Sequence, residues 1–156
     1  MWAYISGTGS YLPSRVMTNA ELCKRVPNCS ADWIEEKLGI SARRIAADEE
    51  QASDLGVAAA KNATASAGIQ PDEIDGIICA IGTGDVITPA TASYIQEKLS
   101  IQNKCFAFDI HMACAGTVSG ITMARGLIES GMYQHILVLG TQVISRTSLD
   151  WDDRTT

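Results

Sequence analysis

The sequence has no long hydrophobic run, and this absence bears first on where the protein can work. A membrane-spanning helix needs about 20 consecutive apolar residues, and no stretch of this chain comes near that length. The N-terminus, Met1-Trp2-Ala3-Tyr4, also lacks the basic segment and apolar core of a secretory signal peptide. We therefore expect no membrane partner and a cytoplasmic location.

Basic residues and metal-binding patterns are scarce as well. Twelve Lys and Arg against 18 Asp and Glu leave a formal net charge of −6, and no basic stripe is present to displace the counterions of a nucleic acid. The five cysteines show no Cys-x-x-Cys spacing, and only two histidines accompany them. We expect no nucleic-acid partner, no zinc site and no disulfide framework, so that most of the cysteines should be reduced thiols.

What is present is typical of one globular domain. The 156 residues are 46% hydrophobic and 19% charged, which suits an ordinary globular protein with a real core. No internal repeat or linker divides the chain. We expect a single domain over residues 1–156.

Hydrophobic patterning predicts strands that alternate with helices. Near-continuous apolar runs over residues 76–82 and 136–140 are typical of central parallel strands that are buried on both faces. An alternating run over residues 105–110 and an N-terminal run over residues 4–9 complete the predicted strands. Capping residues and apolar spacing place helices at residues 19–25, 31–38, 54–67, 89–99 and 113–130. This order predicts an α/β fold with a mixed, mostly parallel sheet and helices on both faces.

One stretch, from Asp109 to Gly116, carries chemistry. It would deliver Cys114 from the end of a strand onto the first turn of a helix, where unpaired backbone N–H groups and the positive end of the helix dipole favour the thiolate. Small residues on either side let a substrate approach the sulfur. A buried structural cysteine is the competing interpretation, and local physics alone leaves both open.

The helix that follows Cys114 has no strongly polar face before Arg125 and Glu129. A helix that is apolar or small all round is buried on every side. We therefore expect something outside these residues to cover it.

The chain offers Cys114 no convincing base. Of its two histidines, His111 should point away from the sulfur, and His135 should begin a strand and be exposed. A nucleophile elbow would need glycine where Met112 stands, so a thiol hydrolase of that kind is not indicated. Cys79 and Cys105 lie in predicted strands and should be inert packing thiols.

Trp33 and Lys37 form a second feature, because they lie four residues apart on one predicted helix. An aromatic plane and a cation would then share one helix face. The alternative is a tryptophan that packs on the core beside a solvated lysine, and spacing alone leaves both open.

Together these motifs resemble one enzyme family. In order they are Tyr4-Ile5-Ser6-Gly7-Thr8-Gly9-Ser10-Tyr11-Leu12-Pro13, Ser30-Ala31-Asp32-Trp33-Ile34, Gly39-Ile40, Ala113-Cys114-Ala115-Gly116 and Asp153-Arg154. Over essentially its whole length the chain is similar to the N-terminal half of a β-ketoacyl-acyl-carrier-protein synthase III, a condensing enzyme of the thiolase superfamily. The resemblance implies a thiolase-like half fold and an acyltransferase that starts fatty-acid synthesis. In it, Cys114 would take an acyl group from acyl-CoA, and a malonyl unit on acyl carrier protein would lose carbon dioxide and attack the thioester.

The resemblance also implies roles for further residues. Trp33 and Arg154 would contact CoA, and the N–H of the nucleophile would donate to an oxyanion. Lys37 stands where the family usually has an arginine, and Cys29 stands where it usually has a threonine, so both CoA contacts would be altered. Thr88 stands where related enzymes often present a phenylalanine to the acyl pocket of the neighbouring subunit.

The implied partners are acyl-CoA, acyl carrier protein and a second copy in a homodimer, with acyl-CoA as substrate and no resident cofactor. The family's catalytic His and Asn lie in a second half beyond these residues. We therefore expect a fragment, either truncated, cleaved or one subunit of a split enzyme, that does not condense by itself.

Two rival interpretations stay open. One keeps the fold and the cysteine but changes the reaction to that of a thiolase, a polyketide-type synthase or another acyltransferase. The other makes the chain a non-catalytic interaction module or partner subunit whose uncovered helix binds another protein.

Overall fold

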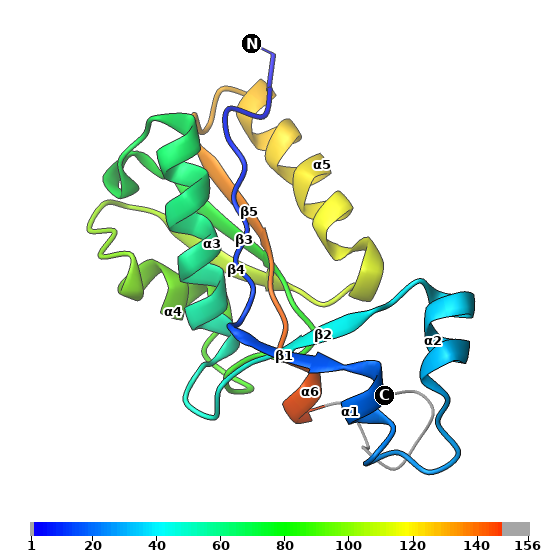
Figure 1. Ribbon diagram of the computed structural model, residues 1–156. Helices are drawn as coiled ribbons and strands as arrows, with labels where there is room; N and C mark the ends of the chain where they lie inside the picture. Colours follow the sequence, from blue (N-terminus) through cyan, green and yellow to red (C-terminus); the bar gives the residue numbers. More distant parts are fainter. Residues whose placement is uncertain (1, 148–156) are drawn as a thin grey trace. The chain divides into compact units, whose positions relative to one another are not determined.

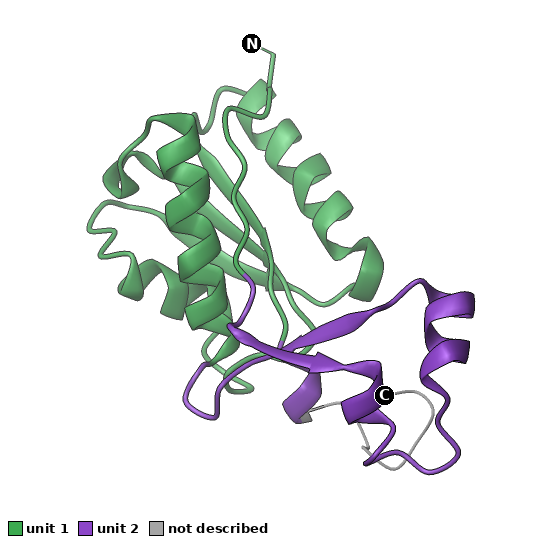
Figure 2. Ribbon diagram, viewed as in Figure 1, with its two compact units in different colours: residues 1–11, 51–142 green, residues 12–50, 143–156 purple. Residues whose placement is uncertain are grey.

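The computed structural model describes residues 2–147, and the chain divides into two compact units (Figures 1 and 2). Unit 1 comprises residues 1–11 and 51–142, and unit 2 comprises residues 12–50 and 143–156. Each unit has a buried apolar cluster of its own. The single domain over residues 1–156 stays a prediction.

Unit 1 is built on a three-stranded parallel sheet with the order β4-β3-β5. Its strands are β3 (Gly76–Ala80), β4 (Phe106–Ile110) and β5 (Ile136–Gly140). All five residues of the central strand are buried, which explains why its sequence is apolar without alternation.

Helices cover both faces of this sheet. The helices α3 (Ala52–Ala67) and α4 (Thr91–Lys98) lie on one face, and α5 (Gly116–Glu129) lies on the other (Figure 1). Short 3-10 turns, η1 (Pro71–Glu73) and η2 (Ala113–Ala115), precede β3 and α5. The predicted α/β fold with a parallel sheet is therefore confirmed.

Small residues bring α5 close to the sheet. Its buried positions are Gly116, Gly120 and Ala124, which are spaced four apart on one face. A Cβ at Gly120 would lie only 2.9 Å from Val138 Cγ1. The stripe of small residues is thus the face that α5 turns to the strands.

The predicted strand over residues 4–9 is wrong, because this segment forms no strand ladder. It runs extended against α3 (Figure 1). A Cβ at Gly7 would lie 2.5 Å from Ala67 N, and one at Gly9 would lie 2.3 Å from Ala63 N. Only glycine permits this approach, and the segment packs on a helix instead of pairing with a strand.

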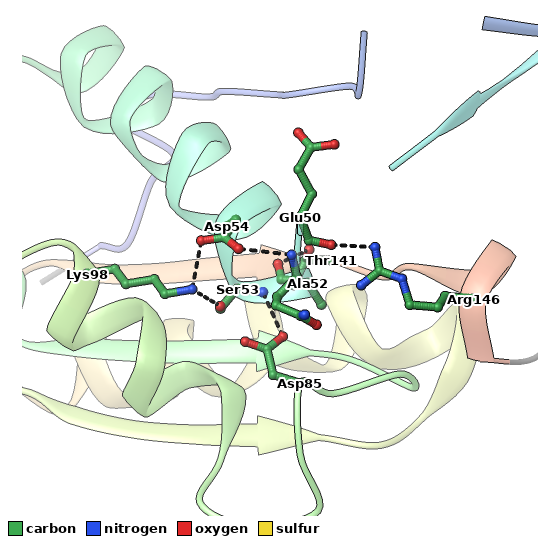
Figure 3. A network of polar contacts seen from close by, with 9 residues as sticks. Glu50, Ala52, Ser53, Asp54, Asp85, Lys98, Thr141 and Arg146 are labelled. Atoms are coloured by element: carbon green, nitrogen blue, oxygen red, sulfur yellow. Dashed lines mark hydrogen bonds and ion pairs between the residues drawn. The ribbon is translucent and has the colours of Figure 1, made fainter. Parts of the chain in front are cut away.

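The start of α3 differs from the predicted start at residue 54. The helix begins two residues earlier, at Ala52, and Gln51 and Asp54 form a reciprocal capping box. Ser53 is buried inside the first turn, where its Oγ accepts a hydrogen bond from Lys98 Nζ at 2.6 Å and its N–H donates to Asp85 Oδ1 at 3.0 Å (Figure 3). A local capping box thus starts the helix, and side chains distant in sequence bind its first turn.

Lys98 also forms an ion pair with Asp54 at 2.7 Å (Figure 3). Burial alone would raise the pKa of Asp54, but hydrogen bonds from Lys98 and from Gln51 N–H outweigh it and lower that pKa. This contact joins the first turn of α3 to the last turn of α4.

The described residues of unit 2, 12–50 and 143–147, form a two-stranded antiparallel sheet and three short helices. These are β1 (Arg15–Thr18), α1 (Asn19–Leu22), α2 (Ala31–Leu38), β2 (Ala42–Ile45) and α6 (Ile144–Thr147). The predicted caps are confirmed, since Thr18 accepts from Glu21 N and Ser30 accepts from Trp33 N, each at 3.2 Å. Arg146 donates to the Glu50 carbonyl at 2.8 Å (Figure 3).

Cys23 and Cys29 form a disulfide in unit 2, where the sequence indicated none, while the other three cysteines are free thiols, as expected of most of them. Their Cα atoms lie 4.9 Å apart, within the usual range for a bridge. The turn between α1 and α2 brings the two cysteines together. Their spacing in the sequence does not predict this pairing.

Within the described part of the chain, no helix is both long and apolar enough to cross a membrane. The polar tail over residues 148–156, including Arg154, lies outside the described residues.

Candidate active site

Cys114 lies in the 3-10 turn η2, two residues before α5 begins, and not on the first turn of that helix as expected. Ala115 N donates to Met112 O at 3.1 Å and closes the turn. Ala113 has a φ of +44°, a left-handed conformation that costs a non-glycine residue about 1–3 kcal/mol and recurs at functional sites. The strand-to-helix junction is therefore a tight turn that carries the sulfur at its middle.

The thiol of Cys114 is exposed, in contrast to the other free cysteines. Burial, with a contribution from Asp109, raises the pKa of Cys79 to about 12. Burial, with a contribution from Asp75, raises the pKa of Cys105 to about 11. Since the thiolate is the reactive form, the raised pKa values disfavour reaction of both thiols, and Cys114 is the candidate nucleophile. Cys79 is buried in β3 as predicted, whereas Cys105 lies just before β4 and is half-buried.

The backbone N–H of Cys114 points to the same chemistry. No residue within the range 2–147 accepts a hydrogen bond from it or from the Cys114 thiol. The next two N–H groups are bonded within the turn, Ala115 N to Met112 O and Gly116 N to Ala113 O. The turn thus presents a nucleophile whose own backbone N–H has no acceptor within the described residues.

Asp109 holds the strand that leads to Cys114, and the sequence analysis gave it no role. Its two carboxylate oxygens accept hydrogen bonds from Thr91 N at 2.7 Å and from Ala92 N at 2.9 Å. These are the first amides of α4, and the N-cap residue Ala90 provides no side-chain acceptor. The sequence signal for this role is an aspartate inside an apolar strand, because a carboxylate that is withdrawn from water requires hydrogen-bond donors.

Beyond its small-residue stripe, α5 is apolar and uncovered. Val118 is 67% exposed, and Ile121 and Met123 are also exposed. None of the described residues covers this face, which agrees with the expectation of an apolar helix without a polar side. That another polypeptide covers it stays a prediction.

His135 lies away from Cys114. It stands at the start of β5, where its Nδ1 is 3.0 Å from the Glu73 carbonyl oxygen. Cys114 follows the end of β4, and parallel strands begin and end at opposite edges of a sheet. His111 is exposed, and no hydrogen bond within residues 2–147 joins it to Cys114. That the base comes from outside these residues stays a prediction.

Thr88 lies in the exposed loop between β3 and α4. This loop follows the carboxyl end of β3, just as the Cys114 turn follows the carboxyl end of β4, so both lie at the same edge of the parallel sheet. The helix after the loop starts at Thr91, and not at Pro89 as predicted. A role of Thr88 in an acyl pocket stays a prediction.

The remaining predicted site residues lie in unit 2 or beyond it. Trp33 is 53% exposed, whereas its neighbour Ile34 is buried, so the alternative of a core-packed tryptophan is wrong. Lys37 forms an exposed ion pair with Glu36 at 2.7 Å. The Cys29 sulfur is bonded to Cys23. The CoA contacts of these residues and of Arg154, which lies outside the described range, stay predictions.

The comparisons with known proteins agree with this geometry. The family pattern of 3-oxoacyl-[acyl-carrier-protein (ACP)] synthase III matches residues 108–156. The β-ketoacyl-[acyl-carrier-protein] synthase III of Neisseria meningitidis serogroup A is 46% identical over 155 residues, which are 99% of this chain and 48% of that protein. The corresponding protein of Neisseria gonorrhoeae is 45% identical over the same shares.

Solved structures show the same likeness. The crystal structure of 3-oxoacyl-[acyl-carrier-protein] synthase III from Aquifex aeolicus superposes with a TM-score of 0.92 at 40% identity, over 97% of this chain and 48% of that one. A priming β-ketosynthase from a polyketide biosynthetic pathway superposes with a TM-score of 0.91 at 35% identity, over 96% and 44%. The chain thus spans about half the length of the proteins it matches.

Proposed function

We propose that this chain, a homologue of the N-terminal half of β-ketoacyl-[acyl-carrier-protein] synthase III, is the nucleophile-bearing half of such a condensing enzyme. The observation that carries the proposal is the exposed thiol of Cys114 on a turn where its own backbone N–H has no acceptor within the described residues. The remaining half of the relatives' length would supply the base and the groups that promote decarboxylation.

In the first step, the Cys114 thiolate attacks the carbonyl carbon of an acyl-CoA thioester. A new carbon–sulfur bond forms, the bond to the CoA sulfur breaks, and CoA leaves as a thiolate that takes up a proton. The N–H of Cys114 is placed to donate to the oxyanion that forms on the way. A single donor of this kind is worth about 3 kcal/mol of transition-state stabilisation.

In the second step, a malonyl group on acyl carrier protein loses carbon dioxide. The electron pair left on its α-carbon attacks the cysteinyl thioester, a carbon–carbon bond forms, and Cys114 leaves as a thiolate. The product is a β-ketoacyl group on the carrier protein, and the free thiol returns to its starting state.

CoA would be held by unit 2. The exposed indole of Trp33 offers a face on which an adenine ring can stack, and Lys37 lies four residues later on the same helix. The oxidised Cys29 has no thiol hydrogen to donate, so it cannot reproduce the contact of a threonine hydroxyl. Arg154 would contact the same CoA molecule through its guanidinium.

Thr88 would face the acyl chain across a homodimer. A smaller and more polar side chain than phenylalanine leaves more room at that position, and the preferred acyl length would change accordingly. Acyl carrier protein is the second protein partner of the proposed reaction.

The test uses the chain mixed with the remaining half of the Neisseria meningitidis relative and radiolabelled acetyl-CoA. Label should appear on the wild-type chain and on a Cys105→Ala variant, since burial raises the pKa of the half-buried Cys105 thiol to about 11. It should be absent from Cys114→Ala. Label retained on Cys114→Ala would refute the assignment of the nucleophile, and malonyl-acyl-carrier-protein added afterwards tests the condensation itself.

A polyketide-type synthase is the second candidate, favoured by the likeness to the priming β-ketosynthase. Both reactions use the same cysteine and differ in the extender. Product analysis with malonyl-acyl-carrier-protein and with malonyl-CoA separates them. A chain that stays a stable, soluble monomer by native mass spectrometry and is never acylated would instead favour a non-catalytic role.

A further inference from the structure

The disulfide bridge of unit 2 takes no part in the proposed reaction. It joins Cys23, the residue that follows α1, to Cys29, which stands just before Ser30, the cap of α2. Both cysteines are half-buried. They pack against the apolar cluster of unit 2, which is formed by Met17, Leu22, Val26 and Ile34. The bridge is therefore not sealed inside the core, and a reagent in solution can reach it.

The fold of unit 2 does not depend chiefly on this bridge. The two cysteines are only six residues apart in the sequence, and a cross-link over a short loop removes less freedom from the unfolded chain than one over a long loop. A reduced cysteine is a small apolar residue that can pack on the same cluster. Unit 2 can therefore keep its fold while the bridge is open, which a reversible exchange requires.

The bridge holds a segment that lacks backbone hydrogen bonds of its own. Such bonds continue through the turn after α1 as far as Val26, whose N–H donates to Leu22 O at 3.1 Å. Within residues 2–147, the backbone of residues 27–29 neither donates nor accepts one. The pattern resumes at Ser30, whose carbonyl oxygen accepts from Ile34 N at 3.1 Å. The sulfur–sulfur bond is thus the covalent link that fixes this segment to the end of α1.

The segment leads directly into the turn that presents Trp33. Cys29 precedes Ser30, whose Oγ accepts a hydrogen bond from Trp33 N at 3.2 Å. Trp33 itself is 53% exposed, so contacts of its own side chain fix the indole only in part. The first turn of α2 consequently sets where the indole face lies, and the bridge anchors this turn on its N-terminal side.

We propose that Cys23 and Cys29 form a thiol–disulfide exchange site, whose oxidised state holds Trp33 ready for CoA and whose reduced state binds CoA more weakly. The co-reactant is a dithiol. The proposal rests on the proposed function, because that function assigns CoA to Trp33. Lys24 is exposed beside Cys23 and brings positive charge to the place where an anionic thiolate attacks.

Two effects of reduction on CoA binding oppose each other. Reduction returns a thiol hydrogen to Cys29, but an S–H group is a weak donor. Reduction also frees the segment before α2, and a ligand that binds Trp33 must then order this segment again. The ordering of even one freed side chain costs a ligand about a factor of two to ten in affinity. The loss therefore outweighs the gain, and reduction weakens binding.

The exchange balances with the dithiol alone. One of its thiolates attacks a sulfur of the bridge, a mixed disulfide forms, and the other cysteine leaves as a thiolate that takes up a proton. The second thiolate of the dithiol then attacks the mixed disulfide and releases the first cysteine. Two electrons and two protons pass to the chain, and the dithiol leaves as a disulfide. Oxidation of the chain is the same sequence in reverse.

Alkylation and mass spectrometry of the full chain test the exchange itself. The folded chain is equilibrated at several ratios of reduced to oxidised dithiothreitol, and its free thiols are then alkylated. The oxidised fraction of the Cys23 and Cys29 peptides should rise and fall reversibly with this ratio. The buried Cys79 thiol should stay unmodified, which verifies that the chain is folded. A bridge that opens only when Cys79 also becomes modified overturns the proposal.

Titration with CoA tests the consequence, on the chain mixed with the remaining half of the Neisseria meningitidis relative. Every chain carries Cys114→Ala, so that the exposed thiol does not react. Reduction should weaken CoA binding about three- to tenfold. Cys23→Ser, which cannot form the bridge, should bind as weakly as the reduced chain in both conditions, whereas Cys105→Ser should respond like the parent. Equal binding by the oxidised and reduced parent, or tighter binding after reduction, overturns the proposal.

Failure of this inference is distinguishable from failure of the proposed function. A complex that binds CoA equally in both states overturns the exchange site and leaves the condensing activity intact. Amide hydrogen exchange of the chain alone gives a readout without CoA, since reduction should speed exchange at the Trp33 amide. Faster exchange there, with no CoA bound in either state, supports the hold of the bridge on α2 and overturns the CoA site of the proposed function. An unchanged Trp33 amide overturns the exchange proposal.

Discussion

Replacing Asp109 by alanine should destabilise unit 1 more than any other single loss of a helix cap. The carboxylate binds the N–H groups of Thr91 and Ala92 at 2.7 and 2.9 Å. The α4 helix has only eight residues and no capping side chain of its own. Asp109 therefore ties the start of α4 to the strand that leads to Cys114.

The magnitude follows from these contacts. Each hydrogen bond to a charged group contributes about 1.5–3 kcal/mol, and a carboxylate at a helix N-terminus adds about 0.3–1 kcal/mol. Because the site is only partly buried, the lower values apply, and the expected loss is about 3 kcal/mol. With an unfolding slope of about 2 kcal/mol per molar urea, the midpoint should fall by about 1.5 M.

Urea unfolding of the purified chain, followed by circular dichroism, measures this change. Asp109→Asn retains one acceptor oxygen and should recover about half of the loss. The matched control is Asp85→Ala, because Asp85 accepts a single bond, from Ser53 N, on a helix that has its own capping box. It should cost about 1 kcal/mol. An Asp109→Ala variant no less stable than Asp85→Ala would refute the reasoning.

Three further predictions concern the same chain. Gly120→Leu should lower the free energy of unfolding by about 1–3 kcal/mol, because even a Cβ at this position meets the sheet. Gly126→Ala should raise it by about 0.4–1 kcal/mol, because the space around Gly126 is open. Urea unfolding measures both changes. Because the pKa of Asp54 is lowered in the folded chain, its contribution to folding stability is present above about pH 4 and is lost as pH falls through the folded pKa. Lys98→Met removes the partner that lowers this pKa, so the variant should lose less stability than the wild type between about pH 5 and pH 3. Thiol titration of the denatured, unreduced chain should count three of the five cysteines, and five after reduction; five before reduction would contradict the disulfide.

Elements predicted correctly depend on short-range patterns. The strands at residues 76–80 and 136–140 follow apolar runs, and burial on both faces of a sheet leaves no polar position in such a run. The helices after Thr18 and Ser30 begin where a side-chain oxygen meets an amide three residues later. Both signals act between neighbours in the sequence.

The errors share the opposite property. Residues 4–9 have a strand-like sequence, but no strand within residues 2–147 pairs with them. Ser53, which precedes the predicted helix, instead lies inside its first turn and binds Asp85 and Lys98, which are 32 and 45 residues away. The Cys23–Cys29 bridge likewise depends on how one turn folds back.

The sequence by itself determined the α/β order, the lack of a strongly polar face on the helix after Cys114, and the resemblance that singles out this cysteine. Periodicity, capping and motif order suffice for these, because each is set by residues close together in the chain. Only the tertiary structure decided that Cys114 is exposed while Cys79 is buried, that Asp109 caps a distant helix, and that β5 has an open edge. Burial and pairing are properties of segments that meet in space, and a single sequence does not specify which segments those are.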